Sequence, residues 1–168
     1  MGLESYRIGV KFKNFHSINE IVDRLKDLGG SVINLEDNRD VSMEFIYTIG
    51  IIEILVSTVK DQNKILFELI GKQSDKLVNK TNDIGNVILN IRFAKPNSVM
   101  IVKRIIELLK EINTQFELKS VSDIEAKCQV DLDNFLDFEE RVNIAKQDFE
   151  KYFHFIPYPV RCSEVFKK

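Results

Sequence analysis

Residues 4–36 read ESYRIGVKFKNFHSINEIVDRLKDLGGSVINLE, and this stretch decides how the fold begins. Apolar and polar side chains alternate over residues 6–13, which predicts a strand with one buried face. The segment that follows spaces its apolar residues as an amphipathic helix does. A second short run of apolar residues, 32–35, predicts another strand. We therefore expect the chain to open β-α-β.

Both ends of the predicted first helix carry clear signals. Ser17 and Glu20 stand three residues apart, the spacing of a capping box in which each side chain satisfies a free backbone amide. Gly29 and Gly30 follow the last apolar residue of the helix. Glycine adopts the left-handed conformation cheaply, so this pair predicts the end of the helix.

The middle of the chain is rich in β-branched and large apolar residues. Residues 43–59 predict two strands or one long bent strand, with Gly50 as the break. A polar turn at residues 61–64 then leads to a further strand at 65–70. We expect these segments to form an antiparallel hairpin at the centre of the sheet.

The second half repeats the alternation of strand and helix. Residues 87–93 predict a strand, and Pro96 ends it ahead of a helix that Asn97 or Ser98 could cap. A strand near residues 116–121 follows that helix. The last long helix is predicted at about 133–152.

These elements favour an α+β fold in one domain over residues 1–168. We expect a mostly antiparallel sheet with helices on one face and a long C-terminal helix. The β-α-β units favour a ferredoxin-like or doubled ferredoxin-like arrangement.

Composition indicates a globular protein of a reducing compartment. The apolar fraction is 44% and the charged fraction 30%, so the chain can build a core. The N-terminus lacks a signal-peptide pattern, and the apolar segments are too short to span a membrane. Cys128 and Cys162 are too few for a disulfide framework and are expected to be free thiols, with a disulfide or a catalytic thiol as the alternatives. We expect the protein in the cytoplasm.

The distribution of charge points to a protein partner rather than to nucleic acid. The net charge of −2 argues against a nucleic-acid binder. Residues 121–150 hold nine acids against three bases, the most acidic part of the chain. An acidic surface of this kind can steer a basic partner into contact. The candidate partner-binding residues are Glu36, Asp37, Asp40, Asp133, Asp137, Glu140 and Asp148.

Motifs of catalysis and metal binding are missing from the sequence. It holds no phosphate-binding glycine loop, no dinucleotide fingerprint and no nucleophile elbow. His16 and His154 lack a neighbouring ligand at metal spacing. The pair His154 and Cys162 carries no signature of a nucleophilic site. We therefore expect no catalytic residue, no metal and no cofactor.

The wealth of Lys, Ile, Asn, Glu and Phe is typical of proteins from AT-rich bacteria. In size, acidity and lack of motifs the chain resembles the small immunity proteins that neutralise partner toxins in bacterial competition. The resemblance lies in overall character. It implies a cytosolic inhibitor that binds another protein, such as a basic toxin domain, through its acidic surface. The alternatives are a small-ligand-binding or self-assembling ferredoxin-like domain, and a small enzyme without a recognisable motif.

Overall fold

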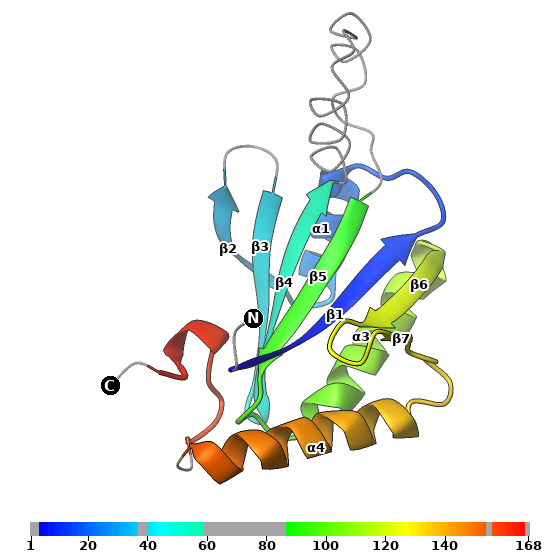
Figure 1. The fold of residues 1–168 in the computed structure, drawn as a ribbon. Coiled ribbons are helices and arrows are strands. Elements are labelled where there is room, and N and C mark those ends of the chain that lie inside the picture. The colour runs from blue at the N-terminus through cyan, green and yellow to red at the C-terminus, as the bar shows by residue number, and fades with distance from the viewer. Residues whose placement is uncertain (1–3, 37–39, 59–86, 154–155, 167–168) are drawn as a thin grey trace, which may run out of the picture.

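The protein is an α+β structure built on a seven-stranded antiparallel sheet (Figure 1). The computed structural model describes residues 4–36, 40–58, 87–153 and 156–166. The strands are β1 (Ser5–Phe12), β2 (Ser31–Glu36), β3 (Asp40–Tyr47), β4 (Gly50–Thr58), β5 (Val87–Ala94), β6 (Leu118–Asp123) and β7 (Cys128–Gln129). The helices are α1 (Ile18–Asp27), α3 (Ile101–Gln115), α4 (Leu136–Tyr152) and the short 3₁₀ helix η2 (Cys162–Glu164).

The strand order is β2-β3-β4-β5-β1-β6-β7. After β1, the chain crosses through α1 to the far edge and returns as the meander β2 to β5, whose last strand pairs with β1. It then passes through α3 to β6 on the other side of β1. The expected antiparallel sheet is confirmed. The ferredoxin-like arrangement is not shown, because three strands separate β1 from β2.

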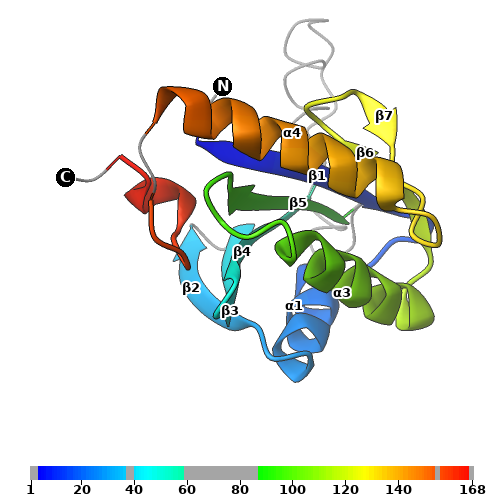
Figure 2. The same ribbon diagram turned by 90° about the horizontal axis from the view of Figure 1, so that it is seen from below.

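The two faces of the sheet differ in what covers them. On the covered face, alternate residues of β1, β3, β4 and β5 point toward α1 and α3 and form the core. Figure 2 shows both helices on that same side. On the open face stand the intervening residues, many of them charged. The central core residues of the covered face are Ile8, Val10, Met43, Ile52, Ile54, Leu89, Ile91 and Phe93, each at most 1% exposed.

The start of α1 follows the sequence prediction closely. The Ser17 hydroxyl accepts the Glu20 amide at 3.2 Å, and the Glu20 carboxylate accepts the Ser17 amide at 2.8 Å. The Ser17 amide, and then the Ser17 hydroxyl, which donates to the same carboxylate at 3.0 Å, lower the pKa of Glu20. At the other end Gly29 has a φ of 98°, the left-handed conformation expected of a helix stop.

The helix α3 begins later than predicted, at Ile101. Ser98 accepts a hydrogen bond from the Met100 amide at 3.3 Å. The Asn97 side chain does not cap the helix. It donates to the Val160 carbonyl and accepts the Val160 amide, both at 3.0 Å. A polar residue that looks like a helix cap therefore fastens the C-terminal segment to the sheet.

The helix α4 runs across the ends of the strands (Figure 1). Phe138 and Val142 in its first half join the main core, while Phe149 in its second half joins a smaller cluster. That cluster holds Ala94 of the open face and the C-terminal residues Val160, Cys162 and Val165. These buried residues thus hold the C-terminal segment against α4 and the end of β5.

Other sequence predictions have mixed outcomes. The strand at 87–93 is confirmed as β5. Residues 43–59 do contain two strands, but the turn between them lies at residues 48–49, and Gly50 is the first residue of β4. The strand expected from residue 43 begins earlier, at Asp40 of β3. The hairpin strand at 65–70 lies outside the described residues. The two-residue strand β7 was not predicted.

Candidate functional site

The predicted acidic residues fall into two groups at opposite ends of the sheet. Asp133, Asp137, Glu140 and Asp148 lie on α4 or just before it, and all four are exposed. Asp40 opens β3 opposite Glu36, the last residue of β2. These strand ends lie far from α4 (Figure 1). Asp37 lies outside the described residues. The structure therefore gathers the α4 acids and leaves the loop acids apart.

Two of the α4 acids have local partners. Asp133 Oδ1 lies 3.1 Å from Lys110 Nζ of α3, and Asp148 Oδ1 lies 2.7 Å from Lys151 Nζ one turn further along. Asp137 and Glu140 make no ion pair with another described residue. Asp137 stands in the first turn of α4, where the helix dipole favours a negative charge.

The solvent side of α4 is not uniformly polar. Leu136, Ile144 and Tyr152 are between 50% and 83% exposed. Glu140 and Asp148 stand between them at steps of four residues, the spacing of a side-chain ridge on a helix. We call Leu136, Glu140, Ile144, Asp148 and Tyr152 the α4 ridge. Apolar and acidic side chains alternate along it, an arrangement that a solvated helix face does not need.

A buried polar network fixes α4 in place. Asp123 is fully buried and accepts hydrogen bonds from the Tyr6 hydroxyl at 2.7 Å and Arg141 Nε at 2.9 Å. The Ala126 amide donates to its other oxygen at 3.0 Å. Burial, and then the contact with Asp123, raises the pKa of Tyr6 well above its ordinary value. This network joins β1, β6 and α4, so its role is to position the helix.

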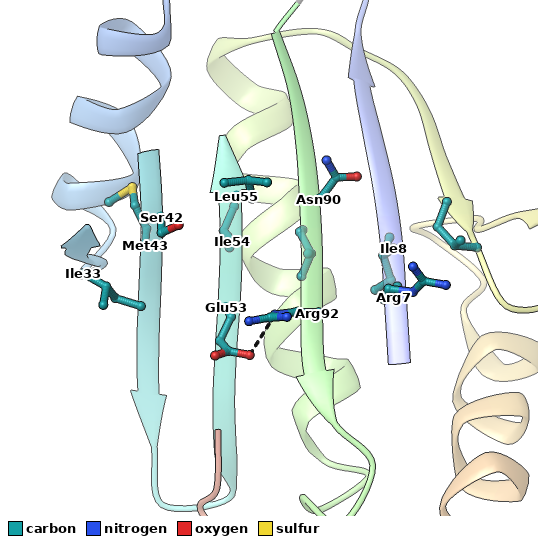
Figure 3. A pocket seen from close by; sticks show the side chains of 12 residues that line it. Arg7, Ile8, Ile33, Ser42, Met43, Glu53, Ile54, Leu55, Asn90 and Arg92 are labelled. Carbon is teal, nitrogen blue, oxygen red and sulfur yellow. Dashed lines mark ion pairs between the residues drawn. The ribbon is translucent and has the colours of Figure 1, made fainter. Parts of the chain in front are cut away.

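The open face of the sheet holds a second candidate site, a hollow of about 350 Å³. Figure 3 shows it over β3, β4, β5 and β1. Arg7, Ser42, Glu53, Leu55, Asn90 and Arg92 line it from the open face, whereas Ile8, Met43 and Ile54 of the same strands belong to the core beneath. Its polar lining includes Arg7, Ser42, Glu53, Asn90 and Arg92, and its apolar lining includes Ile33, Leu55 and Ile124.

A row of charges crosses the sheet beside this hollow. Glu44, Glu53, Arg92 and Arg7 stand opposite one another on β3, β4, β5 and β1. Two like-charged pairs are therefore direct neighbours, which is unfavourable by itself. Each of the four is offset by an opposite charge.

The ion pairs of the row hold it together. Glu53 Oε2 lies 3.1 Å from Arg92 Nε, and Arg7 Nε donates to Glu125 Oε1 at 3.2 Å. Glu44 accepts two hydrogen bonds from Arg161, at 2.8 and 3.0 Å. Arg161 lies next to η2, so this bidentate pair also holds the C-terminal segment on the open face.

Cys162 is poorly placed for nucleophilic chemistry. Both thiols are free, as expected. Cys162 is buried against Glu53, and burial, followed by that contact, raises the pKa of its thiol far above the ordinary value. His16 packs edge-on against the rings of Phe12 and Phe116. His154 lies outside the described residues.

The described residues contain no cluster of three or more His, Cys, Asp or Glu side chains that could hold a metal ion. Among the helices in the described ranges, none has the length and apolar character needed to cross a bilayer. Comparison with known proteins returns no match to a family model, a curated protein or a solved structure.

Sequence reasoning missed the open-face arginines. Alternation already placed Arg7 and Arg92 on the polar faces of two strands. The pairing of β1 with β5, which makes these residues neighbours, was not predicted. Sequence reasoning also placed Leu136 on the buried face of the last helix, whereas this side chain is 69% exposed, and it did not single out Ile144.

Proposed function

We propose that the protein is a protein-binding module whose docking surface is the α4 ridge. The observation that carries the proposal is the alternation of exposed Leu136, Ile144 and Tyr152 with acidic Glu140 and Asp148. Protein interfaces combine apolar anchors with charges that steer association, and aromatic residues are enriched among their hot spots. The matching partner carries basic groups around an apolar groove.

The support for the surface is that α4 is firmly held while the side chains of its ridge are exposed. Asp123 and Lys146 fasten the helix to the rest of the protein, the latter through a 2.8 Å hydrogen bond to the Pro96 carbonyl. A rigid helix face loses little conformational entropy when it docks. In this proposal the partner is a toxin domain with a basic surface, and the protein acts as its cytoplasmic immunity protein or inhibitor.

The test begins with capture of the partner from the native host by tagged protein, followed by binding measurements with purified components. We expect one partner in near-equal amount. Replacement of Leu136, Ile144 and Tyr152 by Ser should weaken binding by about tenfold or more, because hot-spot truncation costs upward of about 2 kcal/mol. If the partner is captured but binds this variant as tightly as it binds the unchanged protein, the interface lies elsewhere.

The charge component has a matched control in the chain. The variant E140K/D148K removes one unpaired acid and one acid of an i,i+3 pair. On α1, D23K/D27K removes the same two kinds of acid, since Asp23 pairs with Lys26 at 3.2 Å. In Figure 2, α3 lies between α1 and α4. We expect the α4 variant alone to bind more slowly, with a weaker dependence on salt. Equal losses in both variants would show a general effect of net charge.

A further inference from the structure

The hollow on the open face has the size and lining of a small-molecule site. Its volume of about 350 Å³ falls at the lower end of the range for ligand pockets, roughly 300–1,000 Å³. The floor is formed by β4 and β5, and polar side chains stand around it at the positions seen in Figure 3. The opposite face of the same strands is filled by the core.

Apolar walls stand on two sides of the hollow. Ile33 of β2 is 52% exposed and Ile124, which follows β6, is 41% exposed, and Leu55 of β4 is half-buried between them. Gly9 makes room for one wall, because a Cβ at this position would lie 3.1 Å from Ile124 Cδ1. The side chain of Ile124 therefore folds over β1 toward the hollow. Exposed apolar groups around a concave site favour a ligand with an apolar body.

The polar groups at the hollow are chiefly donors. Arg7 and Arg92 each meet a glutamate through Nε, at 3.2 and 3.1 Å. Within the described ranges, no hydrogen bond or ion pair engages the Nη groups of either arginine. The Nη1–Nη2 edge of a guanidinium is one of the two edges that can bind a carboxylate with paired hydrogen bonds. Asn90 and Ser42 add an exposed amide and a hydroxyl.

The positive ends of these pairs lie nearer to solvent than the negative ends. The Arg92 side chain is 51% exposed and that of Glu53 only 11%. In the second pair the Arg7 side chain is 40% exposed and that of Glu125 is 24% exposed. Arg7 and Arg92 are also direct cross-strand neighbours, a like-charge contact that a bound anion would relieve. A ligand that enters the hollow therefore meets guanidinium groups before it meets carboxylates.

We infer that the open-face hollow binds a small carboxylate with an apolar body, with its charge on Arg92 and Arg7 and its hydrocarbon against Leu55, Ile33 and Ile124. The site is separate from the α4 ridge, and its occupancy does not depend on a protein partner. Recognition is by paired hydrogen bonds at one end and apolar contact at the other.

The test uses nuclear magnetic resonance of the ¹⁵N-labelled full chain with three probes: 4-methylpentanoate, 4-methylpentanamide and inorganic phosphate. The carboxylate should shift amide signals of β1, β4 and β5 in a saturable way. The neutral amide and the phosphate should each bind about tenfold more weakly, because one lacks the charge and the other the apolar body. Equal binding of all three probes, or no saturable shift by any, would overturn the inference.

Variants test the assignment to Arg92. Replacing this arginine alone leaves Glu53 buried without its partner, so the informative variant is E53Q/R92Q, which removes both charges. The control is R104Q/E107Q on α3, where the arginine is 53% exposed and pairs at 2.9 Å. We expect about tenfold weaker carboxylate binding in the first variant and none of this loss in the second. Unchanged binding in E53Q/R92Q would overturn the assignment.

Discussion

The two faces of the sheet are built from the same strands and treat charge in opposite ways. On the covered face, Asp123 is the only acidic or basic side chain among the described strand residues, and two side chains and a backbone amide satisfy it. On the open face, glutamates and arginines stand in a row, and each of them has a partner of opposite charge. The Nη groups of Arg7 and Arg92 make no hydrogen bond or ion pair within the described ranges. The buried charge of Asp123 on the covered face holds strands and helix together. The charged row on the open face keeps hydrogen-bond donors that a ligand can reach.

The sharpest way to test this comparison is to remove the arginine that pairs with an acid of each face: Arg141 for Asp123 and Arg92 for Glu53. Arg141→Met strands the fully buried Asp123 and should cost about 3–5 kcal/mol in the free energy of unfolding. Arg92→Met leaves the nearly buried Glu53 unpaired, but beside the open hollow rather than inside the core, so a smaller loss of about 1–3 kcal/mol is expected. Urea denaturation of the two variants measures both. A larger loss for Arg92→Met would reverse the roles of the faces.

Two isoleucines of β5 allow the same test without charge. Ile91 is fully buried on the covered face, and Ile88 is half-buried on the open face. Ile91→Ala should lower the free energy of unfolding by about 2–5 kcal/mol, since it leaves a cavity in the core. Ile88→Ala should cost less than about 1.5 kcal/mol, because solvent can fill the space. Equal losses of unfolding free energy in the two variants would mean that side chains on the open face are packed as tightly as those on the covered face.

The C-terminal segment joins α4 to the open face, and Asn97 secures it. Asn97→Ala removes both hydrogen bonds to the buried Val160 and should cost about 1–3 kcal/mol. Hydrogen exchange at the amides of residues 160–166 should accelerate more than exchange in β1. Uniform acceleration throughout the sheet would show that the segment unfolds only with the whole protein.

The smallest expected effect concerns the thiols and leaves stability unchanged. Cys162 is buried beside Glu53 with a raised pKa, so its thiol stays protonated and unreactive at neutral pH. Cys128 on β7 is half-buried. A thiol reagent should label Cys128 first and Cys162 only on unfolding. The variant C128S should take up no label in the native state, and rapid labelling of that variant would contradict the burial of Cys162.

The sequence predicted well what depends on neighbouring residues. The alternation of β1 and the capping box of Ser17 and Glu20 are local patterns with direct physical causes, and both are confirmed. Asn97 was misjudged because its true partner, Val160, comes 63 residues later. The open-face row was missed for the same reason, since it depends on which strands pair.

The position of β1 sets the order in which the molecule can be completed. Its neighbours on both sides come much later in the chain: Ser5 pairs with Ala94, and Ile8 pairs with Asp123. Chains are synthesised from the N-terminus, so β1 is made before either of its partners and must wait for them. Until then its apolar residues have no sheet to join. Contacts so distant in sequence are slow to form. We therefore expect the nascent chain to rely on chaperones until residue 123 has left the ribosome.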